Sequence, residues 1–297
     1  MGIYAMRDRI SVAQVELAGD GARPRLINCH NEVADEQSIK RHFRKARIGD
    51  SPCHLVLDFQ QYELLTAEAP AVPPEELADA MRWRARDLIS RPIEDSVVDA
   101  FLVPEGQRHG RSPAAFVVAA SRHTVDEQVK LARVAGANVE SIDISEMALR
   151  NLVLHAQAHG DEDGLAVVML AEDDGLLAIF REGQLHLSRR IPVSSTRLRQ
   201  AQNDEISEPV LQLAAELRRS FDYYESHYGL PPVASVGLWP QFRGSDRAVR
   251  ELEHQLGVKG YSFVLNDFVD DGDTYDAHHH PGILMAVGAA LRPSFEA

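Results

Sequence analysis

Short apolar runs alternate with helical stripes along the chain, and their order predicts an α/β protein. Ile10–Val15 and Arg25–Cys29, separated by Gly19-Asp20-Gly21, have the pattern of a β-hairpin. Ala115–Ala120 is almost wholly apolar, as expected of a strand covered on both faces. Further strands of the first half are predicted at Leu55–Leu57, Tyr62–Ala67, Val97–Val103 and Val139–Ile144.

A proline hinge and an amphipathic helix follow the strand that ends at Ala67. Pro70, Pro73 and Pro74 must turn the chain, because proline fixes φ and cannot continue a strand ladder. Pro74 with the two glutamates after it suits a helix start. Pro92 ends the run, and the apolar positions at helical spacing are Leu77, Met81, Ala85 and Leu88.

The second half repeats the element order of the first. Residues 160–164 form an acidic segment bounded by glycines, which predicts a domain boundary. Three strands then follow at Leu165–Ala171, Leu176–Arg181 and Leu185–Ile191, joined by Asp173-Asp174-Gly175 and Glu182-Gly183. Because only the order of elements repeats, and not the residues, the duplication is a weak signal by itself.

Helices complete both halves. Thr124 is predicted to cap a helix with Glu127 at its third position, as in a capping box. An apolar stripe over Asn203–His227, ended by Gly229, predicts the longest helix. The remaining predicted elements are helices at Glu36–Arg47, Ser145–His159, Ser245–Leu256 and Pro281–Arg292, and strands at Val233–Leu238 and Tyr261–Leu265.

Composition indicates a globular protein of ordinary type. The 297 residues are 44% hydrophobic and 26% charged, and the net charge of −14 argues against a nucleic-acid binder. Two cysteines suit a reducing cytoplasm. No signal peptide and no transmembrane span are predicted, so association with a membrane would require a partner. The basic run Lys40–Arg47 fits a solvated helix face better than contact with lipid or an acidic partner.

Several segments resemble a known family in order. The hinge "LLTAEAP-VP-EE", the helix "A-RWRARDLI" and the segment "VVAASRHTVDEQVKLARVAGANVESIDISEMALRNL" resemble the MshI family of MSHA pilus biogenesis. They also resemble the wider PilM-type actin-like proteins of type IV pilus assembly. The resemblance implies a duplicated actin-like (ribonuclease H-like) α/β fold with a small inserted αβ subdomain. The implied bounds are 1–160 for the first half, about 58–120 for the insertion and 161–297 for the second half.

The family's nucleotide-binding loops are altered in this sequence. Where relatives read "GIDIGSSS", Tyr4 replaces the aspartate and Met6 the glycine. Where they read "VVDIGAST", Met169 replaces the aspartate and Ala171 the glycine. Methionine offers no hard oxygen to Mg²⁺, and a Cβ blocks close approach of the backbone to phosphate.

The third loop departs in the same direction. The family's "GGGA" becomes Gly237-Leu238-Trp239-Pro240, which fills space and removes an amide donor. We therefore expect no cofactor and no ordinary ATP hydrolysis, although Mg-ATP is not excluded. If nucleotide does bind, Asp173, Asp174 and Gly175 are the candidate residues, and a plain hairpin turn is the preferred interpretation of that tripeptide. The segment "AVGAALR" resembles the family's closing helix, which packs close to the nucleotide cleft.

Other catalytic and metal motifs give no stronger signal. The chain has no phosphate-binding P-loop, no Gly-x-Ser-x-Gly and no His-Glu-x-x-His. The pairs Cys29-His30 and Cys53-His54 lack the spacing of a zinc module. His278-His279-His280 lies in an acidic segment that is expected to be a loop and not a metal site.

The resemblance implies a cytoplasmic structural adaptor, peripheral at the inner membrane, in a type IV (MSHA-type) pilus machine. Its partner would be a bitopic inner-membrane protein of PilN or MshJ type, bound through its N-terminal cytoplasmic peptide beside the inserted subdomain. Candidate groove residues, chosen by type and location, are Tyr62, Leu64, Trp83 and Arg84, with a core role equally open for Trp83. The sequence leaves the oligomeric state undecided, with a homo-oligomer as one of the alternatives. The alternatives are an actin-like ATPase or kinase with altered loops, and a GspL-type secretion component, which would continue into a transmembrane helix.

Overall fold

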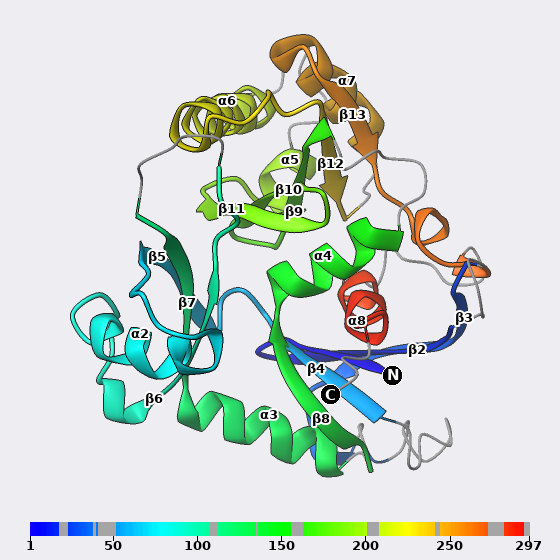
Figure 1. Ribbon diagram of the computed structural model, residues 1–297. Coiled ribbons are helices and arrows are strands. Elements are labelled where there is room, and N and C mark those ends of the chain that lie inside the picture. Colours follow the sequence, from blue (N-terminus) through cyan, green and yellow to red (C-terminus); the bar gives the residue numbers. More distant parts are fainter. Residues whose placement is uncertain are drawn as a thin grey trace.

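The strands of the described residues form two sheets of five strands and one sheet of three (Figure 1). The computed structural model describes residues 1–17, 23–37, 40, 52–106, 112–134, 136–155, 163–200, 208–240, 244–272 and 282–293. The turn at 19–21, most of the basic run, residues 160–162 and the triple histidine therefore lie outside the described residues.

The two larger sheets share one topology. In the first sheet the order is β3 (Arg25–Val33), β2 (Arg9–Glu16), β1 (Gly2–Ala5), β4 (Pro52–Leu57) and β8 (Asn138–Ile144). In the second sheet the order is β11 (Gln184–Ile191), β10 (Gly175–Arg181), β9 (Leu165–Leu170), β12 (Ser235–Trp239) and β13 (Lys259–Ser262). Each has an antiparallel meander followed by parallel strands, which is the duplicated actin-like arrangement.

The third sheet is inserted between β4 and β8. Its order is β5 (Tyr62–Glu68), β7 (Ala114–Ser121) and β6 (Ser96–Leu102), all antiparallel. One face packs on α2 (Leu77–Ala85) through a separate apolar cluster that includes Met81 and Val117. The predicted helix is confirmed, except that Leu88 lies beyond its end and is half exposed, because the chain turns after Ala85.

Two helices lie between the large sheets (Figure 1). Helix α4 (Ser145–His155) contacts β10 and β11 of the second sheet and β4 and β8 of the first. Helix α8 (Ile283–Ala290) packs on α4, β1 and β2, although the expected domain bounds assign it to the second half. Gly2 and Gly288 permit this packing, since a Cβ at either position would collide with backbone atoms of α8 or α4.

The remaining helices cover the outer faces. Helix α3 (Arg122–Val134) packs on the first sheet through Ala132, which belongs to a cluster with Ile3 and Leu55. Helix α3 begins at Arg122, directly after β7, so Thr124 lies inside the helix and the predicted cap is wrong by three residues. On the second half lie α6 (Glu208–Tyr228), α7 (Ser245–Leu256) and the short α5 (Ser195–Gln200). Sequence analysis missed β1 and α5.

A buried polar junction joins the three sheets. The carboxylate of Glu146 on α4 accepts hydrogen bonds from the Tyr62 hydroxyl on β5 and from the Ser188 hydroxyl on β11, the latter at 2.8 Å. The Ser145 amide donates to the Tyr62 hydroxyl at 3.1 Å, and the Ser145 hydroxyl donates to the Leu57 carbonyl at 3.0 Å. Burial raises the pKa of Glu146, and the two hydroxyl donors oppose that rise.

No helix among the described residues is long and apolar enough to cross a membrane.

We predict that Glu146→Ala destabilises the protein by about 2–4 kcal/mol, because two buried hydroxyls lose their acceptor and a cavity remains. Urea unfolding followed by circular dichroism measures the change. Glu140→Ala, at an exposed position of β8, is the control and should stay within about 0.5 kcal/mol of the parent. Equal stabilities of the two variants would contradict a role for Glu146 in joining the sheets.

Candidate functional site

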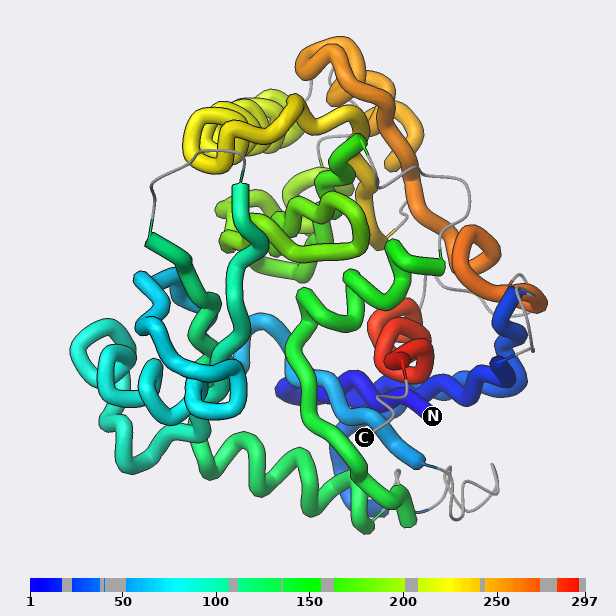
Figure 2. Tube along the Cα trace, in the orientation of Figure 1, coloured from blue at the N-terminus to red at the C-terminus, as the bar shows by residue number. Residues whose placement is uncertain are grey.

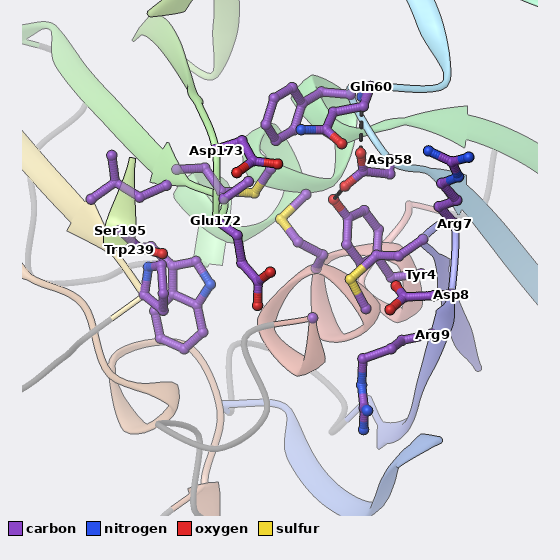
Figure 3. A pocket seen from close by; sticks show the side chains of 18 of the residues that line it. Tyr4, Arg7, Asp8, Arg9, Asp58, Gln60, Glu172, Asp173, Ser195 and Trp239 are labelled. Carbon is purple, nitrogen blue, oxygen red and sulfur yellow. Dashed lines mark hydrogen bonds between the residues drawn. The ribbon is translucent and has the colours of Figure 1, made fainter. Parts of the chain in front are cut away.

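A cleft of about 590 Å³ opens between the two large sheets (Figure 3). This volume lies within the usual range for small-molecule sites. Its walls include residues of all three segments that sequence analysis compared with the family's nucleotide loops, together with residues 58–60 and the start of α8. Gly282 and Met285 bring α8 to this wall, as expected for the closing helix.

Tyr4 occupies the first loop position and is held in place by Asp58. Its hydroxyl donates a hydrogen bond to Asp58 Oδ2, and its ring is buried. Gly282 allows this placement, because a Cβ there would lie 3.1 Å from Tyr4 Cδ1 and 2.4 Å from Ser11 Oγ. The first loop therefore presents a phenol bound to a carboxylate, and not a carboxylate alone.

Asp58 is the most buried carboxylate that lines the cleft. Burial raises its pKa, while the Tyr4 hydroxyl and the Gln60 amide, which donates to Oδ1 at 2.9 Å, oppose the rise. Burial also raises the pKa of Tyr4 well above its ordinary value, with the neighbouring Asp58 adding to the effect. Tyr4 thus remains a neutral hydrogen-bond donor over the physiological pH range.

The second loop is the tight turn of the β9–β10 hairpin. Met169 lines the cleft and is buried. The Ala171 amide donates to the Asp174 carbonyl at 2.9 Å, as in the hairpin turn that the sequence favours. Asp173 lines the cleft, Asp174 accepts a hydrogen bond from Gln60 at 2.7 Å, and Gly175 lies in β10.

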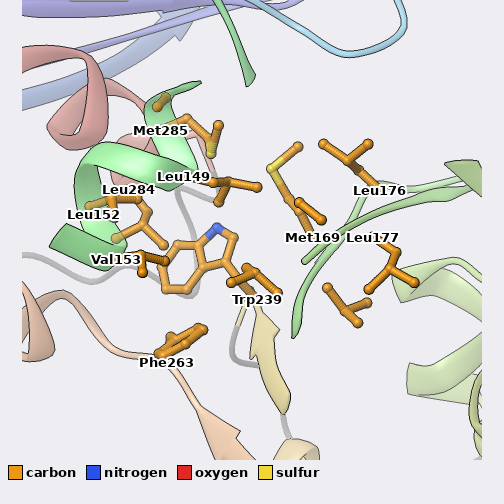
Figure 4. Packing of buried hydrophobic residues seen from close by; sticks show 14 of the residues in the cluster. Leu149, Leu152, Val153, Met169, Leu176, Leu177, Trp239, Phe263, Leu284 and Met285 are labelled. Atoms are coloured by element: carbon orange, nitrogen blue, oxygen red, sulfur yellow. The ribbon is translucent and has the colours of Figure 1, made fainter. Parts of the chain in front are cut away.

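The third loop is filled by an indole ring. Trp239 is only 1% exposed and lies among side chains of α4, α8 and the second sheet, including Leu152, Val153 and Phe263 (Figure 4). It still lines the cleft together with Pro240. Gly237 on the same strand accommodates Phe263, because a Cβ there would lie 1.9 Å from a ring carbon. Trp239 thereby joins the cores of both halves.

Apart from Asp173, sequence analysis missed the charged groups of this cleft. Besides Asp58, these are Arg7, Asp8, Arg9, Glu172 and Arg199. Arg7 and Asp8 lie in the β1–β2 turn and Arg9 begins β2, so their closeness to the cleft follows only from the pairing of these strands. Among the residues that the structure describes, no three His, Cys, Asp or Glu side chains are grouped as a metal site.

Contacts tie the two halves together on both sides of the cleft. On one side, Gln60 bonds to Asp174, and Arg190 donates to the Phe59 carbonyl with its guanidinium 5.7 Å from the Phe59 ring centre. On the other side, Arg25 pairs with Asp271 at 2.5 Å. The backbone of residues 24–26 also bonds to Asp270, so the segment around Asp270 lies beside the start of β3 (Figure 2).

The four predicted partner-binding residues lie in different environments. Tyr62 is buried at the Glu146 junction, and Leu64 is half-buried on the face of the three-stranded sheet opposite α2. Trp83 projects from α2 with 76% of its surface exposed, so the core alternative for Trp83 is wrong. Arg84 is exposed and donates to the Glu68 carbonyl, which brings it to the end of β5.

Solved structures of the same fold cover nearly the whole chain. The PilM-PilN type IV pilus biogenesis complex matches with a TM-score of 0.73 and 18% identity, covering 98% of each chain. The cytoplasmic domain of EpsL, an inner membrane component of the type II secretion system of Vibrio cholerae, matches with a TM-score of 0.50 and 12% identity. The match covers 99% of this chain and 98% of the EpsL chain. A Bacteroides thetaiotaomicron protein with an actin-like ATPase fold and unknown function matches with a TM-score of 0.50 and 8% identity over 92% of each chain.

These identities establish the actin-like fold and no more. No protein-family model matches the chain, and no curated protein matches it.

We predict that Tyr4→Phe lowers stability by about 1–3 kcal/mol, because Asp58 Oδ2 loses its donor. Without this donor the folded-state pKa of Asp58 rises further. Because the pKa of Asp58 is higher in the folded state than its ordinary value of 3.8, the protein loses stability as the pH rises from 3.8 through the folded-state pKa. A higher folded-state pKa in the variant makes this loss of stability larger. The loss should therefore be larger at pH 8 than near pH 4.

Chemical denaturation at both pH values tests this, with Tyr223→Phe on the exposed face of α6 as the control. A loss that is the same at both pH values would show that Asp58 is not the group that Tyr4 stabilises.

Proposed function

We propose that the chain is an adaptor of a type IV pilus machine that binds the N-terminal cytoplasmic segment of a bitopic inner-membrane protein of PilN type. The observation that carries this is the match over 98% of the chain to a protein solved as the PilM-PilN complex. We place the chain in the cytoplasm, peripheral to the inner membrane through its partner. The narrower proposal of an MSHA-type machine, with an MshJ-type partner, rests on the sequence resemblance.

The donor set of the cleft supports an adaptor that does not hydrolyse ATP. At the loop positions it offers a phenol, a thioether and an indole, from Tyr4, Met169 and Trp239. Mg²⁺ takes hard oxygen ligands, and phosphate loops need glycine for close approach of backbone amides. The residues present therefore do not fit Mg-ATP bound as in an actin-like ATPase.

The partner segment is proposed to lie at the inserted subdomain. Leu64 lies in the middle of β5, Arg84 bonds to the Glu68 carbonyl at the end of this strand, and Tyr62 fixes its start through Glu146. Trp83 lies on the outer side of α2, where it is accessible to a second contact with the partner. The secretion-component alternative shares this architecture, since the EpsL domain has the same fold.

We predict that Mg-ATP titrated into the purified protein gives no binding heat up to millimolar concentration, because Tyr4 and Met169 stand where the family has its loop aspartates, and Met6 and Ala171 where it has its loop glycines. Isothermal titration calorimetry measures the binding heat, and an ATPase with an actin-like fold that binds Mg-ATP is the positive control. Micromolar binding would contradict the proposal and favour the ATPase alternative with Asp173 and Asp174 near the metal.

We predict that a synthetic peptide of the N-terminal cytoplasmic residues of the PilN-type protein from the same organism binds this chain. Fluorescence anisotropy with a labelled peptide measures the dissociation constant. Leu64→Glu should weaken binding at least about tenfold, because a charge replaces half-buried apolar surface. Tyr223→Ala, at an exposed site on α6, is the control. Failure of the peptide to bind the parent protein would overturn the adaptor proposal.

A further inference from the structure

The outer edge of β5 is open along its middle. In an antiparallel pair, alternate residues exchange both backbone hydrogen bonds with the partner strand, and the residues between them direct N–H and C=O outward. The Ala69 amide bonds to the Pro113 carbonyl at 2.8 Å, which sets the phase of the β5–β7 ladder. Glu63, Leu65 and Ala67 therefore face β7, and the outward residues are Tyr62, Leu64, Thr66 and Glu68.

Side chains already occupy both ends of this edge. Arg190 donates to the Tyr62 carbonyl at 3.4 Å, and Arg84 donates to the Glu68 carbonyl. Between them, the outward backbone groups of Leu64 and Thr66 have no strand beside them within the described residues. Thr66 is exposed and Leu64 is half-buried, so solvent reaches this edge.

The opposite edge of the same sheet is covered in a different way. The Val103 amide bonds to the Ala114 carbonyl at 2.8 Å, so Ser96, Val98, Ala100 and Leu102 point outward from β6. Asp99 Oδ1 accepts a hydrogen bond from the Ala100 amide at 2.7 Å. The Ser96 carbonyl accepts hydrogen bonds from Arg82 at 3.3 Å and Arg122 at 3.4 Å. Local side chains thus bond to the outward backbone groups of β6 near its middle as well as at its start.

We propose that β5 receives an extended segment of the partner as a fourth strand of this sheet, hydrogen-bonded to the backbone of Leu64 and Thr66. This inference rests on the proposed adaptor function and concerns how the same partner is held. Strand addition gains affinity from the main chain and specificity from alternate side chains. About four backbone hydrogen bonds are available, from the N–H and C=O of two outward residues.

The surroundings define the chemistry of the segment. On the face opposite α2, Leu64 and Val118 lie beside the buried Phe116, so the segment presents apolar side chains there. At the Glu68 end, the Arg84 guanidinium is exposed and available to a carboxylate on the segment, which is a stronger acceptor than a carbonyl. The occupant is therefore an extended peptide with alternating apolar residues and an acidic side chain at the Arg84 end.

Proline substitution tests the backbone bond directly. Thr66→Pro removes one outward N–H but leaves the ladder to β7 intact, because proline is tolerated where the N–H of an edge strand faces solvent. Thr66→Val keeps the N–H and changes only the side chain. Leu102→Pro removes an outward N–H from the half-exposed end of β6 and is the matched control. Circular dichroism and thermal unfolding verify that each variant is folded.

The probe is the labelled N-terminal peptide of the PilN-type partner. We expect Thr66→Pro to weaken binding at least about tenfold, with Thr66→Val and Leu102→Pro within about threefold of the parent. Equal affinities of Thr66→Pro and Leu102→Pro for a peptide that binds the parent would overturn strand addition and leave the adaptor function standing. A peptide that fails to bind the parent overturns the adaptor function itself.

Amide hydrogen exchange gives a readout that does not depend on these variants. In the free protein the outward amides of Leu64 and Thr66 should exchange much faster than those of Leu65 and Ala67, and the peptide should slow them. Slow exchange in the free protein would show that the edge is already covered and would overturn the inference. Unchanged exchange in the presence of a bound peptide would also overturn it.

Discussion

The position of the inserted subdomain depends on the buried carboxylate of Glu146. This group lies on a helix between the large sheets and accepts hydrogen bonds from a strand of the subdomain and from a strand of the second half. A buried carboxylate without donors would be costly, so the two hydroxyls must stay in place for the fold to retain it. The neighbouring Ser145, at the start of the same helix, donates its amide to the Tyr62 hydroxyl and its hydroxyl to the Leu57 carbonyl. A small polar network therefore fixes the angle at which β5 leaves the first sheet.

Side chains that line the cleft also hold the two halves in a fixed position relative to each other. Tyr4 and Trp239 fill space at the cleft, and one apolar cluster includes both of them. The exposed ties at the two sides of the cleft, such as Arg25 with Asp271, are individually weak. The continuous core stabilises the pair of halves more than these ties do, since burial of apolar surface is the main favourable contribution to folding. An actin-like fold whose halves share this core is suited to hold a surface in a constant position.

The sequence predicted the elements that carry periodic patterns and failed where a contact spans a long stretch of chain. The hinge helix, the long helix and most strands follow from local spacing. The core role that sequence analysis left open for Trp83 is wrong, although the buried spacing of Leu77, Met81 and Ala85 already directs Trp83 outward. Strand β1 and helix α5 are too short to show periodicity. The bond between Tyr62 and Glu146 joins residues 84 positions apart, and no local signal marks Glu146 as buried.

The two edges of the small sheet show how such a surface can be kept specific. An open strand edge risks pairing with any other chain, and proteins usually cover or charge it. On β6, Asp99, Arg82 and Arg122 bond to the outward backbone groups at the start and near the middle of the strand. On β5, among the contacts of the described residues, the bonded outward groups lie at the two ends, where Arg84 and Arg190 limit the open part to two outward residues. A stretch this short cannot hold an arbitrary strand by backbone bonds alone, so a stable complex needs side chains that match the apolar face and the arginines. Selectivity would then come from the short length of the open edge as much as from its chemistry.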